Sequence, residues 1–354
     1  MTTTKTISFE TQSAPKVIAW ESTRACNFAC VHCRADAQKT ADPGQLTTKE
    51  VTGLLEQIAG FCKPIFIITG GDPLLRIDVF EIAAYASSLG LTVVMSPSGS
   101  NLTMETFTRM KAAGVKMISL SLDGSNAGVH DNFRQVSGAF DLAMKNISLA
   151  RQMDFAFRIN TTVTQHNIAD LFNIQKIAFE TGAKEWDVFM LVPTGRGKIT
   201  MEITPSQYEE TIQAIYKASL SSPIPIKMTC APQYTRVIAQ HQKQSVPSNQ
   251  IKHHGGRGCM AGNGFCFISH VGEIFGCGFL PLSAGNVRQQ NFKEIYQQSP
   301  LFVQLRDHTL LKGKCRRCEY QTTCGGCRAR ALSLKNEYLE EEPYCTYQPK
   351  NAMQ

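Results

Sequence analysis

Residues 17–33 read VIAWESTRACNFACVHC, a short apolar run that passes directly into three closely spaced cysteines. The apolar residues at 17–20 predict a β-strand that is covered on both faces. Cys26, Cys30 and Cys33 follow it in a C-x3-C-x2-C spacing. Three thiolates can hold three irons of a [4Fe–4S] cluster and leave the fourth iron open to another ligand. The alternative is a zinc site made by these cysteines together with His32.

Beyond this first strand, apolar runs and amphipathic stretches alternate up to about residue 220. The runs predict further strands at 64–69, 91–96, 117–122, 155–163 and 186–192. The amphipathic stretches predict helices at 47–61, 78–89, 103–113, 139–153, 167–181 and 205–220. Six consecutive strand–helix units predict a parallel sheet, and six are too few for a closed eight-stranded barrel. We therefore predict an α/β fold whose core is a partial (β/α)6 TIM-like barrel.

The character of the sequence changes after residue 220. Residues 221–258 are rich in Pro, Ser, Gln, His and Gly, which predicts a linker. Residues 259–354 hold eight of the 13 cysteines, which predicts a small domain held together by metal centres. The expected organisation is thus an N-terminal tail (1–16), a core (17–220), the linker, and this Cys-rich domain.

Composition excludes several classes of protein. The net charge is +7, from 36 Lys and Arg against 29 Asp and Glu, but no dense basic stripe indicates nucleic-acid binding. No apolar run approaches the roughly 20 residues of a membrane span. The first 15 residues lack the layout of a secretory signal, so we expect a cytoplasmic protein. In that compartment an odd number of cysteines favours metal or iron–sulfur ligation over disulfides.

The segment 23–33 resembles the signature of radical S-adenosylmethionine (radical SAM) enzymes. In that family SAM chelates the open iron, and its reductive cleavage gives a 5′-deoxyadenosyl radical that takes a hydrogen atom from the substrate. Segments after four later strands resemble the family's SAM-binding motifs, although a turn, strand-end capping and core packing are the ordinary alternatives. Asp72 stands where the family usually has Glu. The resemblance implies SAM contacts from Gly70, Gly71, Asp72, Pro73, Ser98, Ser121, Asp123 and Val192, and no other catalytic side chain.

The C-terminal cysteine spacing resembles the SPASM domain, which binds two auxiliary [4Fe–4S] clusters. Its last four-cysteine block usually has three residues where this chain has only Gly325 and Gly326. A pair of four-cysteine zinc sites is the alternative. Carried over residue by residue, the resemblance assigns Cys259, Cys266, Cys277 and Cys327 to the first auxiliary cluster and Cys315, Cys318, Cys324 and Cys345 to the second.

Two cysteines remain outside these sets. Cys62 ends an apolar helix pattern and is interpreted as a buried structural thiol. Cys230 lies near the expected junction between the domains, where it is a candidate to touch the substrate or a cluster.

Within the SPASM group, residues 16–348 resemble the tetrapyrrole-modifying enzymes of the alternative heme pathway (AhbC and AhbD) and of heme d1 synthesis (NirJ). The resemblance rests on segments such as 18–24, 130–134, 191–198, 264–270 and 324–330. An AhbD-like enzyme converts two propionates of Fe-coproporphyrin III to the vinyl groups of heme b by oxidative decarboxylation. An auxiliary cluster would accept the released electron, and a flavodoxin or ferredoxin would supply the reducing one.

Other functions stay open on the sequence alone. An AhbC-like enzyme would remove two acetates from 12,18-didecarboxysiroheme. A peptide maturase would need a peptide-binding segment for which few residues precede the first strand, and a binding module would not need the open cysteine site. Anionic propionates favour basic partners. The candidate substrate residues are Arg134, Arg158, Arg196, Lys198, Cys230 and Arg257, and the candidate neighbours of a porphyrin iron are His253, His254 and His270.

Overall fold

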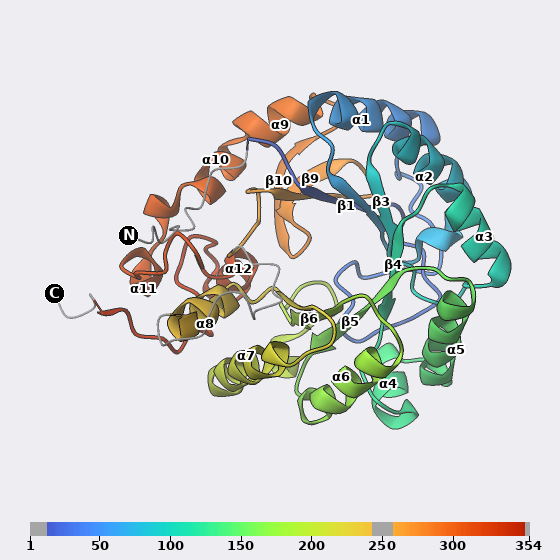
Figure 1. Cartoon of the computed structure of the whole chain (residues 1–354). Coiled ribbons are helices and arrows are strands. Elements are labelled where there is room, and N and C mark those ends of the chain that lie inside the picture. Colours follow the sequence, from blue (N-terminus) through green and yellow to red (C-terminus); the bar gives the residue numbers. More distant parts are fainter. Residues whose placement is uncertain (1–12, 243–257, 351–354) are drawn as a thin grey trace, which may run out of the picture.

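The computed structural model describes residues 13–242 and 258–350. The described strands form one ten-stranded sheet in the order β10-β9-β8-β1-β2-β3-β4-β5-β6-β7. The sheet curls into part of a barrel with helices around its outside (Figure 1). The strands are β1 (Val17–Glu21), β2 (Ile65–Thr69), β3 (Thr92–Met95), β4 (Met117–Ser121), β5 (Phe157–Val163), β6 (Trp186–Met190), β7 (Ile226–Thr229), β8 (Phe265–Ile268), β9 (Glu273–Cys277) and β10 (Leu280–Asn286).

Strands β1 to β7 pair in parallel and in chain order, which confirms the predicted partial barrel. The C-terminal domain continues the same sheet, because β8 pairs in parallel with β1 on the side opposite β2. Strands β8, β9 and β10 then form an antiparallel meander. The carboxyl ends of the parallel strands share one edge of the sheet, where barrel enzymes place their active sites.

Six helices of the core follow the predicted amphipathic stretches, with ends shifted by a few residues, whereas the helices at Ala127–Arg134 and Gln233–Gln242 were not predicted. Thr47 begins the first helix with a capping box to Glu50, and Thr204 caps the seventh with Pro205 at its first position. The core helices are α1 (Thr48–Phe61), α2 (Val79–Ser88), α3 (Met104–Ala112), α4 (Ala127–Arg134), α5 (Ala139–Gln152), α6 (Leu171–Glu180), α7 (Pro205–Leu220) and α8 (Gln233–Gln242). The C-terminal domain adds α9 (Phe292–Gln298), α10 (Pro300–Arg306), α11 (Gly313–Arg316) and α12 (Arg328–Lys335).

The expected linker at 221–258 is in part ordered structure. Strand β7 extends the sheet beyond β6, and α8 packs against α7. The barrel therefore has a seventh parallel strand. The sequence analysis did not predict β7, because this edge strand has only four residues and follows the Pro- and Ser-rich segment 221–225.

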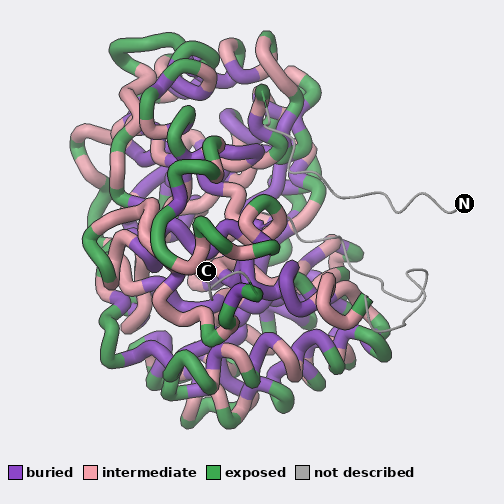
Figure 2. Tube along the Cα trace, turned by 90° about the vertical axis from the view of Figure 1, so that its left-hand side faces the viewer, coloured by how far each residue is buried: buried purple, intermediate pink, exposed green. Residues whose placement is uncertain are grey.

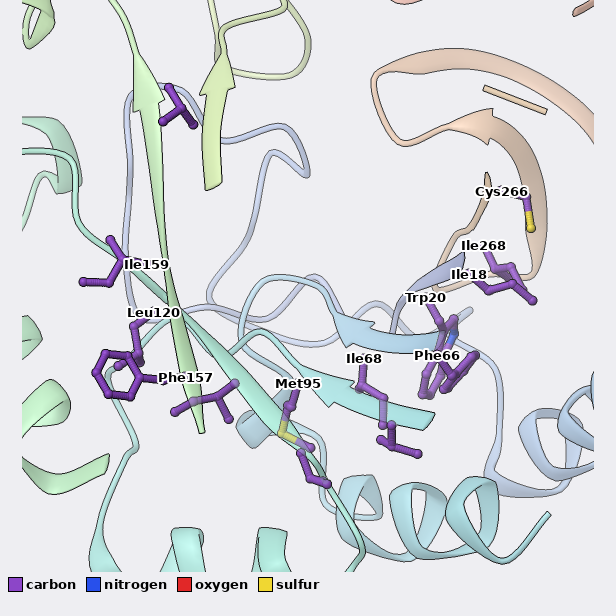
Figure 3. Packing of buried hydrophobic residues seen from close by; sticks show 14 of the residues in the cluster. Ile18, Trp20, Phe66, Ile68, Met95, Leu120, Phe157, Ile159, Cys266 and Ile268 are labelled. Atoms are coloured by element: carbon purple, nitrogen blue, oxygen red, sulfur yellow. The ribbon is translucent and has the colours of Figure 1, made fainter. Parts of the chain in front are cut away.

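The hydrophobic core lies between the sheet and its outer helices, and buried residues line the inside of the chain trace (Figure 2). Trp20 and Phe66 stack there with ring centroids 6.0 Å apart. Side chains of β8 continue this layer, with Cys266 beside Ile18 and Ile268 (Figure 3). Full burial of one large apolar side chain stabilises the fold by about 1.5–3 kcal/mol. The C-terminal domain thus shares the core of the barrel.

Among the described residues, no helix combines the length and the apolar character needed to cross a membrane.

Candidate iron–sulfur and SAM site

The loop after β1 brings Cys26, Cys30 and Cys33 together at the carboxyl edge of the sheet. Cys26 and Cys30 are buried in one cluster with Phe28, and Cys33 packs against them. Backbone N–H groups point at two of the sulfurs: Phe28 N lies 3.4 Å from Cys26 Sγ, and Ala37 N lies 3.5 Å from Cys33 Sγ. Such donors stabilise thiolates that bind an iron–sulfur cluster.

The turn after β2 lies directly against this cysteine loop. Gly71 N donates to the carbonyl of Thr23, and Asp72 N donates to the carbonyl of Ala25, both at 2.7 Å. A Cβ atom on Gly71 would stand 2.3 Å from the Ala25 oxygen, a separation no side chain tolerates. The glycines of the Gly70-Gly71-Asp72-Pro73 segment are therefore required by the close approach of two backbones, beyond any role in a turn.

The Asp72 carboxylate is buried and held by the segment after β3. Its Oδ2 accepts hydrogen bonds from Ser98 Oγ (2.6 Å), Ser100 Oγ (3.0 Å) and Asn101 Nδ2 (3.3 Å). Its Oδ1 accepts from Leu74 N in the short helix that Pro73 begins. Burial and the Asp72 charge together raise the pKa of Cys26, which places the carboxylate beside the thiols. Two of the predicted SAM residues, Asp72 and Ser98, thus bond to each other.

A pocket connects the cysteine loop with the ends of β3 and β4. Its lining includes Phe28, Ser98 and Ser121 together with Asn146 of α5. Asn146 Nδ2 donates to the Gly99 carbonyl at 2.9 Å, whereas its Oδ1 is buried with no partner among the described residues. A buried acceptor without a donor fits a pocket that receives a polar ligand such as SAM.

Arg134 lies beside the cysteine loop, and its side chain already pairs with groups of the protein, so it is not free to bind a substrate propionate. It is buried, forms an ion pair with Asp123, and points Nη1 at Cys30 Sγ at 3.5 Å. Asp123 in turn accepts a hydrogen bond from Thr162 N at 2.7 Å. The predicted SAM residue Asp123 is therefore engaged in holding Arg134 beside the cysteine loop.

Arg158 and Val192 are not among the residues that line the pocket between the cysteine loop and the ends of β3 and β4. Arg158 bonds to Ser119 and Glu185 near the amino ends of the strands, opposite the cysteine edge. The side chain of Val192 is buried in the hydrophobic core.

The segment after β6 lies against the cysteine loop. Arg196 Nε donates to the Cys30 carbonyl at 3.0 Å, and the Arg196 N–H donates to the Cys33 carbonyl at 2.9 Å. Lys198 is exposed two residues further on. Of the basic candidates, Arg196 thus supports the loop, and Lys198 remains open to a substrate.

The two described histidine candidates are also engaged elsewhere. His32 is buried and packs on the Phe133 ring, with 4.4 Å between the ring centroids. His270 lies between Glu21 and Asp42, with its Nδ1 2.8 Å from Glu21 Oε1, so it is no ligand to a porphyrin iron. Although burial opposes it, bonds to His270 and Arg34 lower the pKa of Glu21 to about 2.

Arg34 is a site residue that the sequence analysis missed. Its guanidinium bonds to Glu21 and lies 4.3 Å from the ring centroid of Phe267 on β8. Its position directly after Cys33 is the sequence feature that could have indicated its role. It joins the cysteine loop to the C-terminal domain.

The four thiols of the second predicted auxiliary set line one cavity. Arg236 and Lys314 lie at the same cavity, where Lys314 bonds to the Cys345 carbonyl. Two cations beside four thiolates fit a cluster site of net negative charge. The four cysteines that line the cavity are Cys315, Cys318, Cys324 and Cys345.

The first predicted auxiliary set is divided by the sheet. Phe267 of β8 pairs with Phe275 of β9, so Cys277, two residues further on, shares the face of these two rings. Cys266, next to Phe267, points to the other face and lies in the helix-covered core, where Cys62 is a neighbour. The assignment of Cys266 to a cluster with Cys277 is therefore wrong, because a side chain cannot cross its own sheet.

The remaining candidates are placed as follows. Cys62 caps the end of α1 and is half-buried, and its partial burial raises its pKa to about 11. Cys230 directly follows β7, and its carbonyl accepts a hydrogen bond from Arg330 Nη1 at 3.2 Å. His253, His254 and Arg257 lie outside the described residues.

No three His, Cys, Asp or Glu side chains of residues 13–242 and 258–350 are close enough to hold a single metal ion, as either zinc alternative requires. A [4Fe–4S] cube places each thiolate on a different iron and so needs a wider spacing.

Comparison with known proteins gives two matching domains. The profile described as Radical SAM superfamily matches residues 20–178, and the iron-sulfur cluster-binding domain named SPASM matches residues 259–319. Both domains imply [4Fe–4S] clusters, and the first implies SAM.

Individual relatives cover almost the whole chain. An AdoMet-dependent heme synthase of Methanosarcina barkeri is 46% identical over 95% of this chain and 98% of its own. The Fe-coproporphyrin III synthase of the same organism is 26% identical over 93% of this chain and 87% of its own. The crystal structure of Streptococcus suis SuiB bound to precursor peptide SuiA superposes with a TM-score of 0.75 at 17% identity, over 96% of this chain and 77% of SuiB, which establishes a common fold.

Proposed function

The chain belongs to the radical SAM superfamily and carries a SPASM domain, and from this premise we propose that it acts on an iron tetrapyrrole. The reaction is the oxidative decarboxylation of two propionates of Fe-coproporphyrin III to the vinyl groups of heme b. One observation carries the proposal: the 46% identity to an AdoMet-dependent heme synthase spans nearly the full length of both chains. The Fe-coproporphyrin III synthase, which would represent acetate removal, is only 26% identical.

The residues at the carboxyl edge of the sheet divide the work of the first site. Cys26, Cys30 and Cys33 would hold a [4Fe–4S] cluster, and Ser98 and Asp72 would serve the polar groups of SAM bound beside it. When both are bound, one-electron reduction supplies a 5′-deoxyadenosyl radical. Arg134, in contact with Cys30, offsets the negative charge of the thiolates.

The substrate chemistry balances for each propionate. The β-carbon gives up one hydrogen atom, which ends in 5′-deoxyadenosine. The carboxylate then leaves as CO2, the C–C double bond forms, and one electron is released. One electron is consumed when SAM is cleaved, and one is released when the substrate radical loses CO2. Each round is therefore redox-neutral overall. An auxiliary cluster held by cysteines of the C-terminal domain would give the released electron an acceptor, and a flavodoxin or ferredoxin is the proposed donor of the entering one.

Mass spectrometry of an anaerobic reaction tests the proposal. Reconstituted enzyme, SAM, a reductant and Fe-coproporphyrin III should give 5′-deoxyadenosine and a porphyrin that has lost CO2 and two hydrogens at each of two propionates. The Cys26→Ala variant is the control and should give neither product. Loss of acetates from 12,18-didecarboxysiroheme would establish the other reaction instead. Unchanged masses for every tetrapyrrole tried would refute a porphyrin substrate.

A further inference from the structure

The first auxiliary cluster lacks its fourth predicted ligand once Cys266 is placed on the far face of the sheet. Cys259, Cys277 and Cys327 remain of the four predicted ligands. Cys277 shares its face with Phe267, the ring under Arg34 of the cysteine loop. Cys259 N donates to the Cys324 carbonyl, so it lies beside the second cluster cavity. A closed, four-thiolate site therefore needs a sulfur from another part of the chain.

Cys230 is held next to these three thiols by the network around Arg330. Cys327 caps helix α12, and Arg330 lies in the first turn of that helix. The buried Arg330 guanidinium donates to the Cys230 carbonyl, and Tyr208 Oη donates to the same oxygen at 3.1 Å. The end of β7 and the start of α12 are thereby fixed to each other.

The surroundings of the two rival thiols differ in the expected way. The thiols near enough for their charge to affect the pKa of Cys230 include Cys327, Cys277 and Cys259. Those that act on Cys266 are Cys62 and Arg306, on the other side of the sheet. Cys230 also has a positive φ of 59°, a backbone conformation that non-glycine residues adopt only rarely.

We propose that Cys230 is the fourth ligand of the first auxiliary cluster, together with Cys259, Cys277 and Cys327. The inference rests on the SPASM cluster and is independent of the tetrapyrrole substrate. It makes the site a closed one, in which every iron has a protein thiolate, so that the cluster passes electrons without binding substrate. The segment between the two domains would then supply one cluster ligand. The cluster would join the end of β7, the β8–β9 hairpin and the start of α12.

A matched pair of variants tests the proposal. Cys230→Ala and Cys266→Ala remove the same atom from two buried positions of the anaerobically reconstituted enzyme. Iron and acid-labile sulfide are counted, and EPR spectra of the dithionite-reduced proteins are compared, with no porphyrin present. We expect Cys230→Ala to lose about a third of its iron, or one cluster of three. Cys266→Ala should keep the full iron content and the wild-type spectrum.

Several outcomes would overturn the proposal. Full iron with an unchanged spectrum in Cys230→Ala would do so, as would loss of a cluster in Cys266→Ala. If Cys230→Ala does not fold, Cys230→Asp keeps an anionic ligand and should hold three clusters with a shifted auxiliary EPR signal. An unshifted signal in that variant would count against Cys230 as a ligand. Because no readout involves a porphyrin, a wrong substrate would leave these results untouched.

Discussion

The guanidinium of Arg330 provides the sharpest test of how the two domains hold together. It is fully buried and lies 3.2 Å from Glu202 Oε1 and 3.5 Å from Glu342 Oε1. It also donates to the Leu191 carbonyl at 2.7 Å and to the Cys230 carbonyl. An Arg330→Met substitution keeps most of the volume and removes every one of these bonds.

The expected loss of stability follows from the groups left behind. Two buried carboxylates, Glu202 and Glu342, would lose their positive partner, and breaking a buried pair in this way costs about 3–5 kcal/mol. Burial already raises the pKa of Glu202. The variant can therefore reduce its penalty by taking up a proton, so the loss should be smaller at pH 6 than at pH 8.

Anaerobic urea unfolding followed by circular dichroism measures this difference. With a slope of about 3 kcal/mol per molar urea, the midpoint of Arg330→Met should fall by about 1 M or more. The control is Lys335→Met on the exposed end of the same helix, which should change stability by less than about 0.5 kcal/mol. A loss below about 1 kcal/mol for Arg330→Met at pH 8 would refute the view that this network joins the domains.

Two further predictions concern the first site. Burial lowers the pKa of His130 to about 3, and its neutral Nδ1 accepts the Asp123 N–H at 3.0 Å. An unfolded histidine has a pKa near 6.5, so below that pH the unfolded state takes up a proton that folded His130 does not. The free energy of unfolding should therefore fall by about 1.4 kcal/mol per pH unit. A His130→Asn variant should show a shallower fall between pH 6.5 and 5.5. An equal slope in both proteins would contradict this. A Gly195→Ala variant would place Cβ 2.5 Å from the Cys33 carbonyl, so we expect it to lose iron and at least tenfold of its deoxyadenosine formation. Gly182→Ala has a similar positive φ with open space around it and should keep both; equal effects would show that the contact with Cys33 is unimportant.

Much of the fold was predictable because local pattern and global structure agree. The apolar runs became strands β1 to β6, and the helices predicted at 47–61 and 205–220 begin at caps made by Thr47 and Thr204. The cysteine loop and the glycine turn were also predictable, since both are contiguous motifs. Strand β7 was missed because it is short and lies at an edge.

The ligand set of the first auxiliary cluster was not predictable in the same way. Spacing places Cys266 between Cys259 and Cys277, but the two-residue period of a strand decides which face each thiol takes. Likewise, the sequence presented Arg134 as a free cation, whereas its partner Asp123 comes from a neighbouring strand end. The face that a thiol takes and the partner that an arginine finds depend on three-dimensional packing, which the spacing of a motif does not show.

The shared sheet has a consequence for anyone who would study the barrel alone. Without β8, the backbone N–H and C=O groups along one side of β1 would lose their partners. This exposed edge strand would be prone to aggregate. That same strand leads into the three thiols, so a cut before residue 258 would disturb the iron centre more than 200 residues upstream. In this molecule residues 259–354, about a quarter of the chain, complete the sheet that carries the cysteine loop.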